Sequence, residues 1–172
     1  MKILILIDAL DIGGAETHVI TLATELQKCG HNAKVMSAGG ELVDKLKKEG
    51  IKHVMTPNIC KLTCHNFAFL PFQIWAARSI ISREIRKERP DIVHAHTRKT
   101  AFLVSPICKK EKIPLVTTAH AFFSLEGYKN RLSKWGDGTI AVSDDIKSHI
   151  ISAAKIPPRQ IVTIFNGVKT ND

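Results

Sequence analysis

The fold is decided by the stretch Ile3-Leu4-Ile5-Leu6-Ile7, which is followed by Asp8 and then by Asp11-Ile12-Gly13-Gly14-Ala15-Glu16. Five consecutive apolar residues without polar alternation are typical of a strand that is buried on both faces of a sheet. Behind the glycine pair, apolar residues recur with the helical period at Ala15, Val19, Leu22 and Leu26. The N-terminus therefore predicts a buried strand, a glycine turn and an amphipathic helix.

The same alternation continues along the chain. Further short apolar runs lie at 33–37, 53–56, 91–95, 115–118, 139–142 and 161–165. Helical patterns lie between most of them, at 15–29, 41–49, 71–89, 97–111 and 143–154. Ser143 suits an N-cap, and Pro106 predicts a kink or a late start in the helix over 97–111. Strands that alternate with helices predict one α/β domain, a doubly wound Rossmann-like parallel sheet of about seven strands.

Composition excludes several classes of protein. The chain has 172 residues, of which 44% are hydrophobic, and this suffices for a single domain with its own core. The net charge of +9 favours anionic partners without choosing between phosphates, nucleic acid and an acidic membrane surface. The basic residues are spread along the chain and no nucleic-acid reading motif is present, so we expect no nucleic-acid partner. No targeting or membrane-spanning segment is predicted, and free thiols in a cytoplasmic protein are the expectation for Cys29, Cys60, Cys64 and Cys108.

Chemistry is expected at one edge of this sheet. Ligands of open parallel sheets bind outside the carboxyl ends of the strands. Polar residues and glycines follow the predicted strands at that edge: Gly13, Gly14, His96, His120, Ser143, Asn166 and Gly167.

Gly13 and Gly14 have two interpretations. They can let the backbone of a helix N-terminus approach a phosphate, or they can simply form a tight turn. A nicotinamide site is less favoured, because G-x-G-x-x-G is absent and no acidic residue follows the second strand. A P-loop is excluded, because no Gly-Lys-Ser/Thr follows.

Histidines are the other candidates at this edge. His120 can donate a hydrogen bond to a sugar hydroxyl, take part in proton transfer, or only cap the following loop. His94 and His96 share one face if their strand continues through both, and with His120 they could form a metal trio. No carboxylate ligand is nearby, and Cys60-x-x-x-Cys64-His65 lacks a second pair, so no metal is expected.

Five segments in series resemble a known family. They are residues 11–18, 90–96, 114–120, 137–143 and 161–168. Together they resemble the N-terminal half of a retaining GT-B glycosyltransferase. The family includes many lipopolysaccharide, capsule and phosphatidylinositol mannosyl- or glucosyltransferases. The resemblance runs from Met1 to about Val168.

The resemblance implies half of a two-domain enzyme. Residues 1–168 would form the Rossmann-like acceptor-binding domain and 169–172 the start of the interdomain linker. The C-terminal donor-binding domain would be absent, so this chain alone is expected to be inactive. The substrates would be a nucleotide sugar and a glycan or lipid-linked acceptor, with no metal or other cofactor.

Roles carry over residue by residue. His120 would be the catalytic residue that contacts the donor sugar, and Gly13 and Gly14 would approach the donor phosphates. Five further residues would bind the acceptor: Glu16, His96, Arg98, Lys99 and Thr118. Ser143 and Asn166 would lie at the edge of the cleft.

Residues 67–89 are a candidate for contact with an anionic membrane surface, at the inner face of the plasma membrane. Aromatic residues come first, at Phe67, Phe69, Phe72 and Trp75, and basic residues follow, at Arg78, Arg83, Arg86, Lys87 and Arg89. Alternatively, Ile74, Ile81 and Ile85 pack on the sheet and the arginines lie in water. The competing function for the whole chain is a free-standing nucleotide- or phosphate-binding module of flavodoxin type without catalysis, in which Asp8 would be the phosphoacceptor.

Overall fold

The computed structural model describes residues 1–56, 70–123 and 133–167. Its strands are β1 (Lys2–Leu6), β2 (Asn32–Ser37), β3 (Lys52–Met55), β4 (Ile92–Ala95), β5 (Leu115–Ala119), β6 (Gly138–Ala141) and β7 (Ile161–Thr163). Its helices are α1 (Gly14–Lys28), α2 (Val43–Lys48), α3 (Leu70–Glu88), α4 (Arg98–Glu111) and α6 (Asp144–Ala154), with a short 3-10 helix at Pro158–Gln160.

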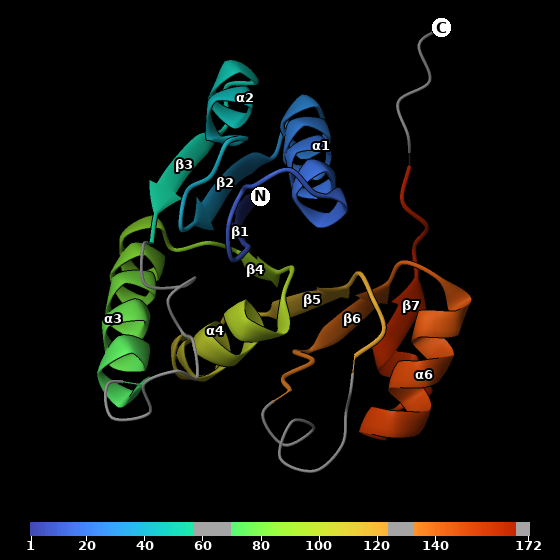
Figure 1. The fold of residues 1–172 in the computed structure, drawn as a ribbon. Coiled ribbons are helices and arrows are strands. Elements are labelled where there is room, and N and C mark those ends of the chain that lie inside the picture. The colour runs from blue at the N-terminus through green and yellow to red at the C-terminus, as the bar shows by residue number, and fades with distance from the viewer. Residues whose placement is uncertain (57–69, 124–132, 168–172) are drawn as a thin grey trace, which may run out of the picture.

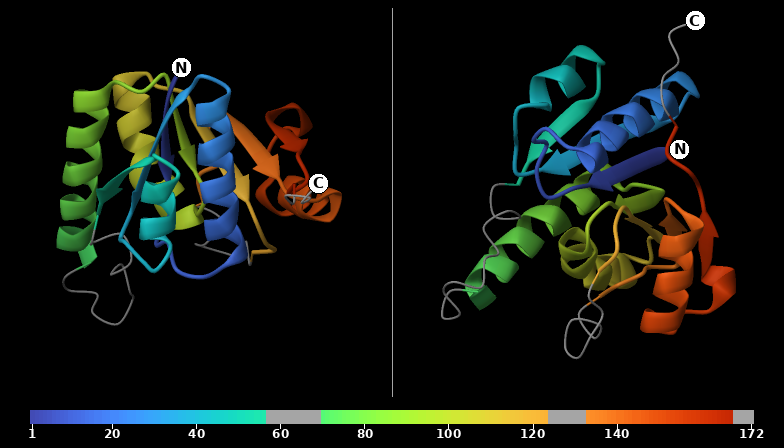
Figure 2. Two further views of the ribbon diagram at one scale, coloured as in Figure 1. Left: turned by 90° about the horizontal axis from the view of Figure 1, so that it is seen from above. Right: turned by 45° about the vertical axis from the view of Figure 1, so that its right-hand side comes forward.

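The strands form one parallel sheet in the order β3-β2-β1-β4-β5-β6-β7 (Figure 1). The helices α1 and α2 cover one face, and α3, α4 and α6 cover the other (Figures 1 and 2). From β1 the chain first builds outward to β2 and β3, and then returns to place β4 on the other side of β1. This confirms the doubly wound Rossmann-like sheet of seven strands, and it places the switch in strand order beside β1.

β1 explains why the apolar run has no polar alternation. Leu4 and Leu6 pack into the core beneath α3 and α4, whereas Ile3, Ile5 and Ile7 pack beneath α1 and α2. Residues 4–7 are at most 1% exposed. Both faces of the strand are buried, so each residue of the run contributes to one of the two cores.

The sequence predicts a kink or a late start at Pro106, and the late start is wrong, because α4 begins at Arg98 and continues through Pro106. Thr97 caps its first turn by accepting a hydrogen bond from the Thr100 amide at 3.1 Å. Pro106 has no N–H to offer the carbonyl of Phe102, four residues earlier. The guanidinium of Arg78 on α3 supplies the missing donor, at 3.2 Å from that carbonyl oxygen, and lies 5.0 Å from the centre of the Phe102 ring. A residue from another helix therefore compensates for the proline.

A charged group lies under α3. Glu84 is 9% exposed and pairs with Lys34 of β2 at 2.9 Å, and Glu88 contacts the same ammonium at 2.7 Å. Burial by itself would lower the pKa of Lys34, but the hydrogen bonds that its ammonium donates to Glu88 and Glu84 outweigh burial and raise that pKa.

Candidate functional site

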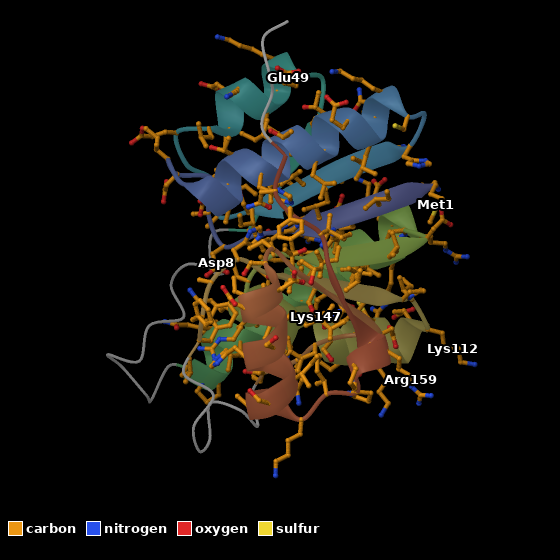
Figure 3. The ribbon with its side chains drawn as sticks, turned by 90° about the vertical axis from the view of Figure 1, so that its right-hand side faces the viewer. Met1, Asp8, Glu49, Lys112, Lys147 and Arg159 are labelled. Carbon is orange, nitrogen blue, oxygen red and sulfur yellow. The ribbon has the colours of Figure 1, made fainter. Side chains whose placement is uncertain are left out.

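The carboxyl ends of the strands meet at the edge marked by Asp8. Figure 3 shows Asp8 and Met1 at opposite ends of β1, with Lys112 and Arg159 on the side of Met1. Because all strands run parallel, the segments that follow β1, β4, β5, β6 and β7 begin at the Asp8 edge. This is where a ligand of an open α/β sheet is expected.

The glycine turn leaves the N-terminus of α1 without a side-chain cap. Gly13 is the N-cap residue in an extended conformation, and no side chain accepts a hydrogen bond there. Neither Gly13 nor Gly14 has a positive φ, so another residue could adopt their backbone conformation without strain. The lack of a side chain is important here because it leaves free space around the turn. A Cβ on Gly14 would meet nothing within 4 Å, whereas a Cβ on Gly13 would collide with the carboxylate of Glu16.

A hollow of about 380 Å³ opens at this turn. Gly13, Gly14 and His18, at the start of α1, line it together with Asn166. Gly13, Gly14 and Asn166, which the sequence predicts for the site, thus line one hollow. A larger hollow of about 680 Å³ lies at the amino ends of β5 and β6, where Lys109, Lys112 and Asp137 line it. Volume alone therefore does not locate the site, and the strand direction favours the hollow at the glycine turn.

Four histidines gather under α1. His94 pairs in register with Val116 of β5, so the alternation of strand side chains brings His94, His96 and His120 to the same face. The His94 and His96 ring centres are 4.2 Å apart, and those of His96 and His120 are 5.3 Å apart. The ring of His18 on α1 lies 5.6 Å from that of His96 and 5.2 Å from that of His120.

Hydrogen bonds tie this histidine cluster to the sheet. His94 Nε2 lies 2.7 Å from the hydroxyl of Thr118, and His96 Nδ1 lies 3.0 Å from His120 Nε2. Thr118 therefore belongs to the cluster through His94. Among the described residues, His96 Nε2 is buried and has no hydrogen-bond partner.

The cluster is held uncharged. Burial, with smaller contributions from His18 and His120, lowers the pKa of His94 to about 4. Burial, followed by the effect of His18, lowers the pKa of His120 to about 4, and burial also lowers the pKa of His18. The pKa of the buried His96 falls well below its usual value for the same reason, and His94, His120 and His18 add to the effect. These imidazoles are therefore neutral at physiological pH.

Asp8 is engaged at the N-terminus of α4. One of its carboxylate oxygens accepts a hydrogen bond from the Thr97 hydroxyl at 2.6 Å, and the other lies 3.0 Å from the ammonium of Lys99. The guanidinium of Arg98 lies 4.8 Å from the centre of the Phe123 ring. Lys99 thus pairs with a carboxylate directly after β1, and Arg98 lies against the loop after β5.

Ser143 has the local role that the sequence predicts. Its hydroxyl accepts a hydrogen bond from the Ile146 amide at 3.2 Å and caps α6. It lies between β6 and α6, and it is not among the residues that line the hollow at the glycine turn. His18 is the residue that sequence reasoning missed. The available signal was its position, three residues after Ala15 and four before Leu22 on the buried side of the helix.

Within residues 1–56, 70–123 and 133–167, no group of three or more His, Cys, Asp or Glu side chains has an arrangement that could hold a metal ion. None of the helices described there is long and apolar enough to cross a membrane. Cys29 and Cys108 are free thiols, and burial raises the pKa of Cys108 to about 12. The Cys60, Cys64 and His65 motif, Phe67 and Phe69 lie outside the described residues.

Comparisons with known proteins agree with this architecture. A protein encoded in the cps region of Klebsiella pneumoniae, described as an uncharacterized 42.6 kDa protein, is 28% identical over 93% of this chain. The chain spans about half of that relative, 52% of its length. A glycosyltransferase structure from Rickettsia africae is 26% identical to this chain, with a TM-score of 0.76. The match covers 97% of this chain and 43% of the Rickettsia chain.

Anabaena HepE, solved in complex with UDP-glucose, shares the fold. It has a TM-score of 0.76 at 20% identity, and the match covers 98% of this chain and 44% of HepE. The sequence profile described as Glycosyltransferase Family 4 matches residues 12–172. The doubly wound sheet, the glycine turn at the switch in strand order and this match over nearly all of the chain lead to one conclusion: the chain belongs to glycosyltransferase family 4.

Proposed function

We propose that this chain is the N-terminal, acceptor-binding half of a retaining glycosyltransferase. The enzyme moves a sugar from a nucleotide sugar to a glycan or lipid-linked acceptor of the cell envelope. The UDP-glucose complex of HepE and the cps-region relative support the substrate class and the envelope setting. The family match favours this function over a free-standing phosphate-binding module. In that alternative Asp8, which contacts Thr97 and Lys99, would be the phosphoacceptor.

One observation carries the proposal: the hollow at the glycine turn, with open space where a Gly14 side chain would stand. The uncapped N–H groups of α1 and the positive end of the helix dipole suit a diphosphate. Gly14 lets the ligand approach the backbone, and Asn166, which also lines the hollow, offers an amide. His120 donates to the donor sugar, and Glu16, Arg98 and Lys99 shape the acceptor side. The buried His96 and Thr118 support this edge from within the sheet and do not contact the acceptor themselves.

Gly14→Ala tests this assignment. The added methyl meets no atom of the protein and stands at the first position of a helix, so folding stability should be unchanged or slightly higher. Transfer by the polypeptide that carries both halves should fall by tenfold or more, an effect of about 1.4 kcal/mol or larger. Gly138→Ala is the matched control, because its methyl also meets open space but lies at the amino end of β6.

The assay measures transfer from a panel of UDP- and GDP-sugars to envelope glycans and lipid-linked acceptors. Loss of transfer in Gly14→Ala with full activity in Gly138→Ala supports the site. Equal activity of both variants and the parent would remove the glycine turn from the ligand site. Absence of transfer from any nucleotide sugar would overturn the function itself.

We also propose that α3 rests on an anionic membrane surface at the inner face of the plasma membrane. On a helix of 100° per residue, Phe72, Trp75, Ser79 and Arg83 lie within about 80° of one another. Phe72 is 65% exposed and Trp75 is 64% exposed, and their rings are stacked 5.9 Å apart. The opposite face packs Ile81 and Ile85 into the core, as the alternative reading expects.

The basic residues of α3 divide into two groups. Arg78 and Arg86 bond to α4, through the carbonyls of Phe102 and Leu103 and through Glu111. Arg83 and Lys87 are exposed on the side of α3 that carries Phe72 and Trp75. An exposed aromatic pair followed by cations suits an interfacial helix, to which each cation adds about 1 kcal/mol near anionic lipid.

Co-sedimentation with vesicles of phosphatidylglycerol and phosphatidylcholine tests the membrane proposal. The parent should pellet at low salt, and Phe72→Ser with Trp75→Ser, or Arg83→Glu with Lys87→Glu, should each reduce pelleting severalfold. Lys45→Glu with Lys48→Glu on α2 is the control for net charge, because it makes the same change in net charge but lies on the other side of the sheet. Equal pelleting of all four proteins would refute docking through α3.

A further inference from the structure

The contact between His96 and His120 has room for a single proton. His96 Nδ1 lies 3.0 Å from His120 Nε2, so one nitrogen donates and the other accepts. Burial lowers the pKa of both rings far enough to keep them neutral at physiological pH. Each ring therefore carries one N–H, and the direction of this hydrogen bond determines the tautomer of both residues.

The two directions differ in what they leave buried. If His120 donates, the proton of His96 must lie on Nε2, which is buried and has no partner among the described residues. An N–H group buried without an acceptor is the rarer and costlier case in folded proteins. If His96 donates from Nδ1, its Nε2 carries only a lone pair. The second direction leaves no donor without an acceptor, and it places the proton of His120 on Nδ1.

We infer that His96 is a positioning residue that holds His120 as the Nδ1–H tautomer, so that His120 offers its ligand a hydrogen-bond donor and not an acceptor. The geometry that carries this is the 3.0 Å contact together with the orphaned Nε2 of His96. Among the described residues, Nδ1 of His120 has no partner in the protein. It is the ring nitrogen that remains available to a ligand.

This assignment changes the chemistry open to His120. A protonated Nδ1 cannot accept a proton, so the ring is not a general base toward the ligand. Its lowered pKa also keeps the ring uncharged, so His120 donates this hydrogen bond as a neutral imidazole and not as a cation. The ligand atom opposite should therefore be an acceptor, such as a sugar hydroxyl oxygen. Naming that atom rests on the proposed function, whereas the tautomer itself does not.

The tautomer is read directly by long-range proton–nitrogen correlation spectroscopy on ¹⁵N-labelled protein at pH 7.5. A nitrogen that bears a proton and one that bears a lone pair resonate far apart, and His120→Gln identifies the signals of His120 by their loss. The expected spectrum has a protonated Nδ1 and a bare Nε2 for both His96 and His120. A protonated Nε2 on His120 in the parent protein would overturn the inference, whatever any variant does.

Two substitutions of His96 then separate positioning from packing. His96→Asn places an amide donor near the former Nδ1 and should preserve the His120 tautomer, whereas His96→Leu should change the tautomer ratio by about fivefold through the loss of one hydrogen bond. His94→Gln is the control, because its partner is Thr118 and not His120. An unchanged ratio in a folded His96→Leu protein would exclude positioning by His96.

Activity of the polypeptide that carries both halves gives the functional readout. His96→Leu should lower kcat severalfold with little change in KM for the acceptor, and His96→Asn should restore kcat. If the tautomer is as expected but no nucleotide sugar is used, the proposed function fails and the inference stands. If transfer occurs but the His120 proton lies on Nε2, the proposed function stands and the inference about the tautomer fails.

Discussion

Acidification should destabilise this protein through His94. In the folded chain its pKa is about 4, because burial and the neighbouring His18 and His120 oppose its charge, while an unfolded chain protonates it near 6.5. Its contribution to stability is therefore complete above pH 6.5 and is lost as the pH falls toward 4. Between pH 7.5 and 5.0 the two pKa values give a loss of about 2 kcal/mol in the free energy of unfolding.

Urea denaturation of residues 1–172 at the two pH values measures the total loss, to which His120 and His96 also contribute. The share of His94 alone corresponds to a fall of about 1 M in the urea midpoint for a domain of this size. His94→Gln removes the titrating ring but keeps an amide that can form a hydrogen bond with the Thr118 hydroxyl near the position of Nε2. That variant should be less stable at pH 7.5, yet it should lose about 2 kcal/mol less on acidification.

His31→Gln is the control, because His31 follows α1 and lies outside the histidine cluster. It should retain the pH dependence of the parent. If the parent and His94→Gln lose the same stability between pH 7.5 and 5.0, the proton uptake does not occur at His94. The account of a neutral buried cluster would then be refuted.

Three other outcomes are expected. Arg78→Leu should cost about 1–2 kcal/mol of stability, because it leaves the Phe102 carbonyl without a donor. Adding Pro106→Ala to this variant should recover part of the loss, because alanine restores an N–H. Additive effects of the two substitutions in a double-mutant cycle would contradict this coupling. Glu84→Leu should lower the thermal midpoint less than Lys34→Leu does, because the lysine keeps Glu88 as a partner whereas Lys34→Leu leaves two carboxylates without theirs; scanning calorimetry decides the order. Residues 1–172 alone should unfold cooperatively and show no sugar transfer, and steady turnover by this chain would refute the view that it is half of the catalytic unit.

The strands and helices were readable from local patterns because each pattern has a local cause. The run at 3–7 is apolar throughout because both faces of β1 are covered, and Ser143 caps α6 through an amide three residues away. Local patterns are less reliable where distant groups take part. The late start expected at Pro106 does not occur, because Arg78 from another helix supplies the missing donor. The strand predicted over 161–165 ends at Thr163 in the structure, and Ile164 and Phe165 are exposed.

The sequence by itself determined the order of the elements and the edge at which polar residues collect. It also showed that His94 and His96 share a face, since strand side chains alternate with a period of two. Only the tertiary structure decided which strands are neighbours and which helix covers that face. Those two facts bring His120 within 3.0 Å of His96 and place His18 beside both, although these residues are far apart along the chain. Pairing between distant strands depends on the packing of the whole core, and a local pattern does not contain that information.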